Sequence, residues 1–288
     1  MLDDALAVVA AWPAATAGLL GLLVGSFLNV VILRLPPRLM HQWRADAREL
    51  LDLPAAEEPA PPNLVTRGSH CPKCGHRLAW WENIPVLSWL ALRGRCRACG
   101  TAISLQYPLV EMATAVLSTL VALRFGYSAE TAVALLVTWV LVALTVIDLR
   151  TQLLPDQLTL PLLWLGLLSA AMGLFQSPAA AIAGAAAGYL SLWSVYWVFK
   201  LLTGKEGMGY GDFKLLGALG AFCGVMGLLP IILLSSLIGA IVGGTWLAIR
   251  GRDRATPIPF GPFLAAAGWV QFMYGDRILA LWPGMAPS

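Results

Sequence analysis

Charged side chains are scarce in this chain of 288 residues: lysine, arginine, aspartate and glutamate make up 12% of it, whereas 58% is hydrophobic. A soluble globular domain carries about 25% charged residues. The shortage excludes an ordinary soluble protein and indicates an integral membrane protein. Several apolar runs of roughly 20 residues agree, since each is long enough to cross a hydrocarbon core about 30 Å thick.

Histidine is also scarce, and its positions exclude two classes of membrane protease. His41, His70 and His76 all precede the second apolar run. A serine protease with a Ser-His dyad in the membrane needs a histidine in a span, and a membrane metalloprotease needs H-E-x-x-H. The sequence has neither, so hydrolysis near the bilayer would depend on a pair of carboxylates.

The apolar runs predict an all-α polytopic membrane protein with about eight transmembrane helices. The expected spans are 12–35, 105–124, 129–149, 157–175, 179–201, 212–227, 228–250 and 260–282. The division between 212–227 and 228–250 is the weakest, because only a short segment separates these two spans. The corresponding domains are a first transmembrane helix at 1–35, a cytoplasmic domain at 36–104 and a seven-helix membrane core at 105–288.

The basic residues predict the orientation, because cytoplasmic loops collect Lys and Arg. With both termini outside, all of the 19 lysines and arginines except Arg124 and Arg277 fall in inner loops or at inner membrane edges. We therefore expect periplasmic termini and a cytoplasmic first loop. Asp148 and Asp212, each at the end of a span, then face the same side and can belong to one site.

Four of the five cysteines form two C-x2-C pairs in the first loop, Cys71 with Cys74 and Cys96 with Cys99. Two such pairs, each followed by glycine, predict a zinc-ribbon-like module with tetrahedral thiolate coordination. Disulfides and free thiols are the alternatives, and a reducing cytoplasm argues against disulfides. Because four thiolates leave no open coordination position, we expect the zinc to be structural.

The surroundings of these cysteines leave two further questions open. His70 and His76 flank the first pair, and either is an alternative ligand; Cys223, in a span, is expected to be a small core residue. The module is also basic, which favours anionic lipid headgroups as its partner. We expect no nucleic acid, because the loop lacks aromatic residues interleaved with its basic ones. The basic residues are Arg67, Lys73, Arg77, Arg93, Arg95 and Arg97.

Asp148 and Asp212 are candidates for a catalytic carboxylate pair. Two carboxylates a few ångströms apart share a proton, so the ionised one can activate water while the protonated one donates to the substrate. Gly209 and Gly211 would let a bound peptide approach the backbone closely. For each aspartate alone an ordinary structural role stays open, a helix cap for Asp212 and a snorkelling acid at a helix end for Asp148.

Three other charged residues lie within or beside apolar helices. Lys214 follows Asp212 and is a candidate substrate-binding or site-shaping residue. Glu111 is either a polar partner in the core or a binding residue. Asp156 is expected to cap the helix that follows it.

The ordered motifs of the chain resemble a known family. Gly209-Tyr210-Gly211-Asp212 fits the G-x-G-D signature of the membrane aspartyl proteases, and the rest resembles the bacterial type IV prepilin peptidases. The resemblance covers nearly the whole length. Its further motifs are GSFLNVVILRLP at 25–36, both C-x2-C pairs, ENIPVLSW at 82–89, QYPLVE at 106–111, DLRTQLLPDQLTL at 148–160 and the segment 207–216.

This resemblance implies an aspartic endopeptidase of the bacterial inner membrane with Asp148 and Asp212 as its catalytic pair. It implies removal of a short basic leader, after a glycine, from type IV prepilins and type II secretion pseudopilins at the cytoplasmic face. It also implies N-methylation of the new terminal residue by S-adenosylmethionine. No cofactor-binding residue can be named from the sequence, because no G-x-G-x-x-G follows a strand.

A different class of protein remains as the alternative: a transporter in which Asp148 and Asp212 relay protons or coordinate a cation. Both acids lie at one rim of the membrane rather than at its midplane, and no inverted repeat is visible. A noncatalytic scaffold that binds pilins through the basic module is a second alternative.

Overall fold

The computed structural model describes residues 12–54, 59–64, 68–250 and 259–280, with the side chains of 246–250 left aside. Helices form almost all regular structure in this part of the chain, whose β-structure is limited to two isolated bridges, His70 to Arg77 and Arg95 to Ala102. The prediction of an all-α protein is therefore confirmed. The chain divides into two compact units, Met1–Tyr127 and Ser128–Ser288.

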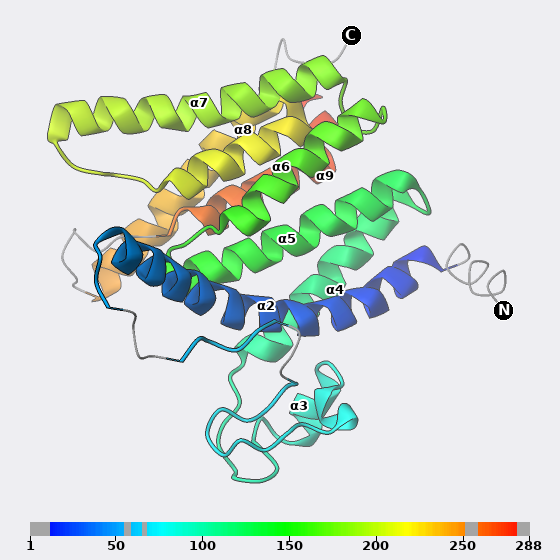
Figure 1. Cartoon of the computed structure of the whole chain (residues 1–288). Helices are drawn as coiled ribbons and strands as arrows, with labels where there is room; N and C mark the ends of the chain where they lie inside the picture. Colours follow the sequence, from blue (N-terminus) through cyan, green and yellow to red (C-terminus); the bar gives the residue numbers. More distant parts are fainter. Residues whose placement is uncertain (1–11, 55–58, 65–67, 251–258, 281–288) are drawn as a thin grey trace. The chain divides into compact units, whose positions relative to one another are not determined.

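In the first unit, α2 (Pro13–Leu50) lies beside α4 (Gln106–Phe125) (Figure 1). Glycines on α2 allow this close approach. A Cβ at Gly21 would lie 2.8 Å from the carbonyl oxygen of Thr114, and one at Gly25 would lie 2.7 Å from the Cα of Glu111. Small residues at a helix–helix contact are typical of membrane helices, which associate through close packing.

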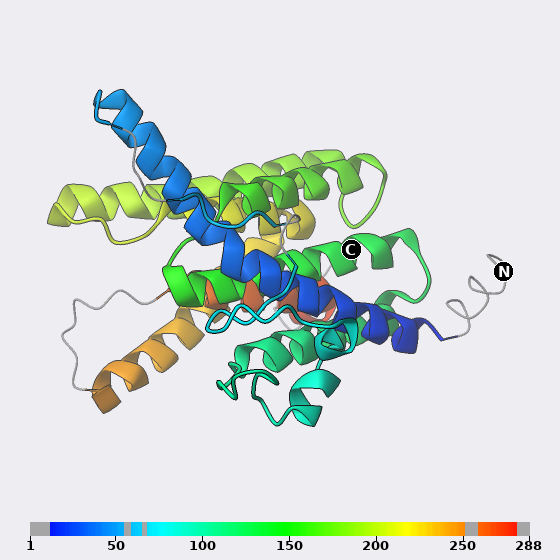
Figure 2. The same ribbon diagram turned by 60° about the horizontal axis from the view of Figure 1, so that its bottom comes forward.

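The predicted end of the first helix at residue 35 differs from the structure, because α2 continues through Pro36 and Pro37 to Leu50. Figure 2 shows it as one continuous ribbon. Proline removes a backbone hydrogen bond and disturbs the turn before it, but its fixed φ is compatible with a helix. Pro36 and Leu39 are buried, and the part of α2 after residue 41 is exposed.

The second unit contains α5 (Ala129–Thr151), α6 (Asp156–Ala171), α7 (Pro178–Thr203), α8 (Tyr210–Arg250) and α9 (Gly261–Ala280). The hydroxyls of Ser128 and Ser177 cap α5 and α7 by accepting from backbone N–H groups three residues ahead. Figure 1 shows α7 beside α8, where a Cβ on Gly184 would collide with the backbone of Gly220.

Helix α8 is broken at Gly224, whose φ of 66° and ψ of 177° are not helical. A straight helix of its 41 residues would be about 60 Å long. Gly211 at its start and Gly261 after its end nevertheless both face Leu154, and the chain from Arg250 to Gly261 spans at most about 40 Å. The chain therefore turns back at Gly224, which allows the start of α8 and the start of α9 to lie near one another.

By length and composition, five helices in the described residues can cross a membrane: α2, α4, α5, α7 and the stretch Tyr210–Thr245 of α8. These fit a multi-pass membrane protein, but they do not confirm the predicted count of about eight. The spans expected at 212–227 and 228–250 are the two parts of α8. Helix α6 has 16 residues, or about 24 Å, which is short of a hydrocarbon core of about 30 Å.

Candidate active site and metal centre

Asp148 lies in the last turn of α5 and is buried, with 5% of its surface exposed. Its Oδ2 accepts a hydrogen bond of 3.0 Å from the backbone N–H of Gly261, the first residue of α9. A Cβ at Gly261 would lie 2.6 Å from this oxygen, so a side chain there would displace the carboxylate. The lack of a side chain at Gly261 therefore permits this contact between α5 and α9.

Asp212 lies in the first turn of α8, which begins at Tyr210, and 8% of its surface is exposed. It is thus inside the helix and does not hold the cap position. The positive end of the helix dipole favours a carboxylate here. Among the described residues its buried Oδ1 has no hydrogen-bond partner. A buried polar atom without a partner is costly and needs an explanation, and an approaching substrate or water would supply one.

Asp148 and Asp212 lie near one another within the second unit. The charge of Asp148 acts on Asp212. Leu154 contacts the neighbours of both aspartates. A Cβ at Gly211, beside Asp212, would be 2.7 Å from the Cβ of Leu154, and one at Gly261, which donates to Asp148, would be 3.1 Å from its Cδ2. The end of α5 and the starts of α6, α8 and α9 therefore meet around this side chain.

The two glycines before Asp212 differ in their surroundings. Gly211 is confined by Leu154, so its lack of a side chain serves packing. Gly209 has open space, and the nearest atom to an added Cβ is Oδ2 of Asp212 at 3.9 Å. Of the two, Gly209 is the position that leaves room beside the carboxylate.

Lys214 forms an ion pair with Asp156, and its Nζ lies 2.7 Å from both carboxylate oxygens. The contact joins the first turns of α8 and α6 beside the aspartate site. The expectation that Asp156 caps α6 is wrong. Pro155 holds the cap position, no side chain makes a capping bond, and Asp156 is the first helical residue. Its carboxylate is engaged by Lys214 instead.

Glu111 lies in the first unit, in α4, and is buried. Its Oε2 accepts a hydrogen bond of 2.7 Å from the backbone N–H of Val86, and the side chain of Ser26 is also a partner. Val86 has a φ of 60°, which is rare for a β-branched residue. The described contacts of Glu111 thus hold the loop before α3 (Leu87–Ala91) in a strained conformation.

The four cysteines of the two C-x2-C pairs converge, and their Sγ atoms lie within 4.8 Å of one another. Sγ of Cys71 is 3.8 Å from that of Cys99, and Sγ of Cys74 is 4.0 Å from that of Cys96. Thiolates at about 2.3 Å from a tetrahedral zinc ion would be about 3.8 Å apart. The donor set fits zinc, and none of these cysteines forms a disulfide.

The local backbone explains why the sulfur atoms converge. In each pair the N–H of the glycine that follows, Gly75 or Gly100, donates to the carbonyl of the first cysteine at 2.9 Å, and both glycines have φ near 70°. Hydrogen bonding with Thr101, through its side chain first and then its backbone, lowers the pKa of the Cys99 thiol to about 6. A backbone N–H bond from His76 opposes the shift at Cys74, but desolvation and the neighbouring thiols raise its pKa to about 11.

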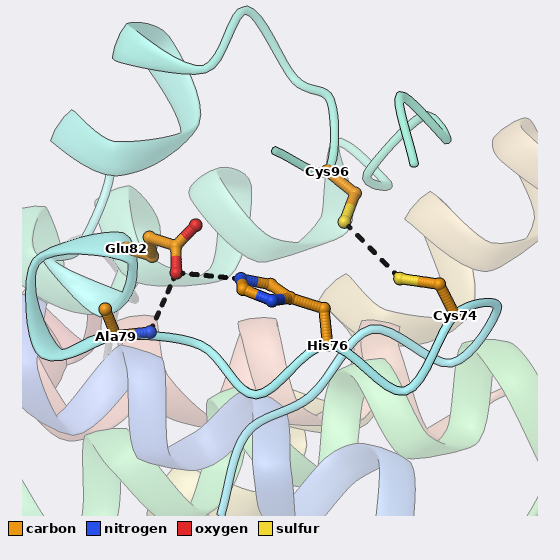
Figure 3. Close-up of polar contacts among 5 residues, drawn as sticks. All are labelled: Cys74, His76, Ala79, Glu82 and Cys96. Carbon is orange, nitrogen blue, oxygen red and sulfur yellow. Dashed lines mark hydrogen bonds and ion pairs between the residues drawn. The ribbon is translucent and has the colours of Figure 1, made fainter. Parts of the chain in front are cut away.

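The two histidines beside the first cysteine pair have other partners. Figure 3 shows His76 directed at Glu82, with its Nε2 3.1 Å from Oε2 of the carboxylate. The same oxygen accepts from the N–H of Ala79 at 2.8 Å, and these two contacts, the backbone bond first, lower the pKa of Glu82. His70 contacts the carbonyl of Gly68 at 3.1 Å. Among the described residues, the group of possible metal ligands therefore consists of the four cysteines, without either histidine.

Comparison with known proteins was made against family models and curated sequences. A model of the bacterial peptidase A24 N-terminal domain matches residues 19–125, and a model of the type IV leader peptidase family matches 135–244. A protein of Xanthomonas campestris, named prepilin leader peptidase/N-methyltransferase, is 59% identical over 265 residues and is covered to 92%, as is this chain. The chain belongs to the type IV leader peptidase family.

Other family members agree in name and length. A Pseudomonas aeruginosa protein of the same name is 57% identical, with 90% of each chain covered, and one from Dichelobacter nodosus is 51% identical, with 91% covered. No solved structure matches the chain. The two family models fall separately on the two structural units, so the N-terminal model contains the cysteine module and the leader peptidase model contains both aspartates.

Sequence reasoning missed Gly261 and Leu154, which line this pair of aspartates. Pro262 after Gly261 indicates the start of a helix, but no pattern shows that the glycine N–H meets an acid 113 positions earlier. Leu154 looks like any apolar residue in a loop before a helix. The role of each residue can be recognised only in the folded structure, where the end of α5 meets the starts of α8 and α9.

Proposed function

We propose that this chain is a membrane aspartic endopeptidase that removes the short basic leader from type IV prepilins and type II secretion pseudopilins after a glycine. The observation that carries the proposal is the pair of buried aspartates around Leu154. The names of the curated relatives support the substrate class. The comparisons give no support to the transporter alternative.

In this proposal Asp148 activates water and Asp212 carries the shared proton. The N–H of Gly261 donates to Asp148, and an ionised carboxylate is the stronger acceptor of such a bond. Asp148 takes a proton from water as the water oxygen attacks the scissile glycine carbonyl. At the same time Asp212 donates its proton to the carbonyl oxygen. When the C–N bond breaks, one hydroxyl of the tetrahedral intermediate returns its proton to Asp212, the leaving amine takes up the proton held by Asp148, and the leader departs with a terminal carboxyl group.

The remaining candidate residues take supporting roles. Lys214, through Asp156, fixes the first turn of α8, and Gly211 keeps Asp212 close to Leu154. Gly209 leaves space for the backbone of the peptide beside Asp212. Glu111 acts in the first unit by holding Val86, so it shapes the cysteine module; a substrate contact is not required for this role.

We further propose that the chain N-methylates the new terminal residue with S-adenosylmethionine, as the names of its relatives indicate for those proteins. None of the described residues is assigned to the methyl donor. Zinc, by contrast, has a defined place: Cys71, Cys74, Cys96 and Cys99 would hold it. A site closed by four thiolates would stabilise the module without taking part in catalysis.

The proposed location is the bacterial inner membrane, with periplasmic termini and the cysteine module and aspartates on the cytoplasmic side. The distribution of lysine and arginine supports this orientation; the termini, 1–11 and 281–288, lie outside the described residues. The basic residues of the module would attract anionic lipid headgroups. A prepilin with its leader in the cytoplasm would then present its cleavage junction at the depth of the aspartates.

One experiment tests both activities. Purified protein in detergent is incubated with a full-length prepilin and labelled S-adenosylmethionine, and the product is followed on a gel and by mass spectrometry. We expect loss of the leader after a glycine and addition of one methyl group to the new N-terminal amine. An intact prepilin would refute the peptidase proposal, and a cleaved but unlabelled product would refute the methyltransferase proposal.

A further inference from the structure

The loop between α7 and α8 carries an acidic side chain, Glu206, close to the start of α8. Its Oε1 lies 2.8 Å from Nζ of Lys200, and 69% of the side chain is exposed. The hydrogen bond from Lys200 lowers the pKa of Glu206, so its carboxylate is ionised at neutral pH. An exposed negative charge therefore stands beside the segment that leads to Asp212.

A contact with α7 holds this loop in position. The ring of Phe199 packs against Gly207, where an added Cβ would lie 2.8 Å from Cε1 of the ring. Helix α8 begins at Tyr210, and the six residues from Glu206 to Asp212 span at most about 21 Å. A peptide held at Asp212 therefore has residues a few positions before its scissile bond within reach of Glu206.

Lys200 does not depend on Glu206 as its sole partner. Its Nζ lies 3.2 Å from the hydroxyl of Tyr196 and 5.5 Å from the ring centroids of both Tyr196 and Trp197. These cation–π contacts would persist if Glu206 took another partner. An exposed ion pair is also weak, so a competing cation can replace Lys200 at the carboxylate.

The other ion pair beside the site is less suited to such an exchange. Lys214 engages both oxygens of Asp156 at 2.7 Å, and bidentate contacts of this kind hold the two side chains in one geometry. Lys200 contacts one oxygen of Glu206, whose side chain is more exposed than that of Asp156. Glu206 is therefore the acid beside the site that is best placed to receive a cation from a substrate.

We propose that Glu206 is a specificity-determining residue, which binds one basic side chain of the leader in exchange for Lys200. This inference rests on the proposed function, which supplies a substrate with a basic leader. The contacting residue lies within about six positions before the scissile bond, because that is the length of peptide that spans about 21 Å. Without Glu206, the nearby Lys200 and Lys205 would repel a basic leader.

The test compares wild type with Glu206→Gln on a prepilin series in which each basic leader residue is replaced singly by glutamine. With the native leader we expect Glu206→Gln to raise KM about three- to tenfold with little change in kcat, as for one charge-assisted hydrogen bond at an exposed site. For one leader of the series, the one in which glutamine replaces the residue that contacts Glu206, wild type and Glu206→Gln should have the same KM. Reversing both charges, with Glu206→Lys and glutamate at that position, should recover part of the loss.

Glu130→Gln is the matched control, because Glu130 lies in the first turn of α5, at the opposite end of the helix from Asp148. Its KM should equal that of wild type for every leader. An unchanged KM in Glu206→Gln would overturn the inference. So would an equal rise for all leaders, which would show that Glu206 only holds the loop. Failure of wild type to cleave the native leader would refute the proposed function itself.

Discussion

At the scale of single residues, the absence of a side chain at Gly261 determines how Asp148 is held. The glycine N–H donates to Oδ2 from a backbone position that a Cβ would occupy at 2.6 Å from the same oxygen. With any larger residue at this position, the carboxylate of Asp148 would have to move away from the Cβ. The second aspartate depends on Gly211 in a similar way, through Leu154.

Replacing Gly261 by alanine should reduce activity by displacing the carboxylate of Asp148. A misplacement of about 1 Å at a catalytic group can cost about 100-fold in rate, so we expect kcat for prepilin cleavage to fall by about that factor. Gly244→Ala is the control, because no atom lies within 4 Å of an added Cβ there. A Gly261→Ala enzyme with the kcat of wild type would show that this contact does not position Asp148.

The candidate aspartates could be named from the sequence, because acids at the ends of apolar runs are rare and need partners. Their partners could not. Gly261 acts through its backbone N–H, which every residue except proline possesses, and Leu154 acts through ordinary packing. Asp156 was assigned to a helix cap because local spacing favours that role, whereas Lys214, 58 positions away, binds its carboxylate.

At the scale of helices, the break in α8 brings the site together. Gly224 has a φ of 66°, and an added Cβ there would lie 3.2 Å from Oε1 of Gln176. Because the chain turns at this point, the start of α8 and the start of α9 both reach Leu154. The division of 212–250 was expected from the sequence; the glycine conformation that produces it was not.

Gly224→Ala should destabilise the second unit. A non-glycine residue with this φ and ψ costs roughly 1–3 kcal/mol, and the close Gln176 side chain adds to this. We expect a lower midpoint of thermal unfolding in detergent, whereas Gly244→Ala should leave it unchanged or raise it, because alanine is the better helix former by about 1 kcal/mol. Equal midpoints for Gly224→Ala and wild type would contradict the strained geometry at the break.

Helix α2 shows where local rules mislead. The Pro36-Pro37 pair predicts an end, yet the helix continues to Leu50 because the prolines have helical φ and Pro36 is buried. An apolar run locates a span well, but it does not determine how far the helix extends beyond the membrane.

At the scale of the whole molecule, the two units carry different chemistry. The cysteine module belongs to the first unit and the aspartate pair to the second. The spacing of the cysteines predicted their convergence, since two C-x2-C pairs favour a single tetrahedral site. The roles of His76 and Glu82 could not be predicted, because their contact depends on how the short helix at Trp80–Asn83 folds back.

Metal analysis tests the module directly. Wild-type protein should contain about one zinc ion per chain, and Cys74→Ser or Cys99→Ser should lose it, because three thiolates and a hydroxyl form a much weaker site. Limited proteolysis within 68–104 should then become faster. Cys223→Ser should retain the metal. Zinc-free wild-type protein, purified without chelator, would contradict the assignment.

The central claim is that Asp148 and Asp212 act as one proton-sharing pair, and cleavage of a prepilin by the two asparagine variants tests it most directly. Asparagine keeps the shape of the side chain but cannot activate water or share the proton. Asp148→Asn and Asp212→Asn should each lower the cleavage rate by about 100- to 10,000-fold, the loss expected for a general acid or base, and should elute and unfold as wild type does. Glu130→Gln should cleave normally. Wild-type cleavage by either asparagine variant would contradict the account.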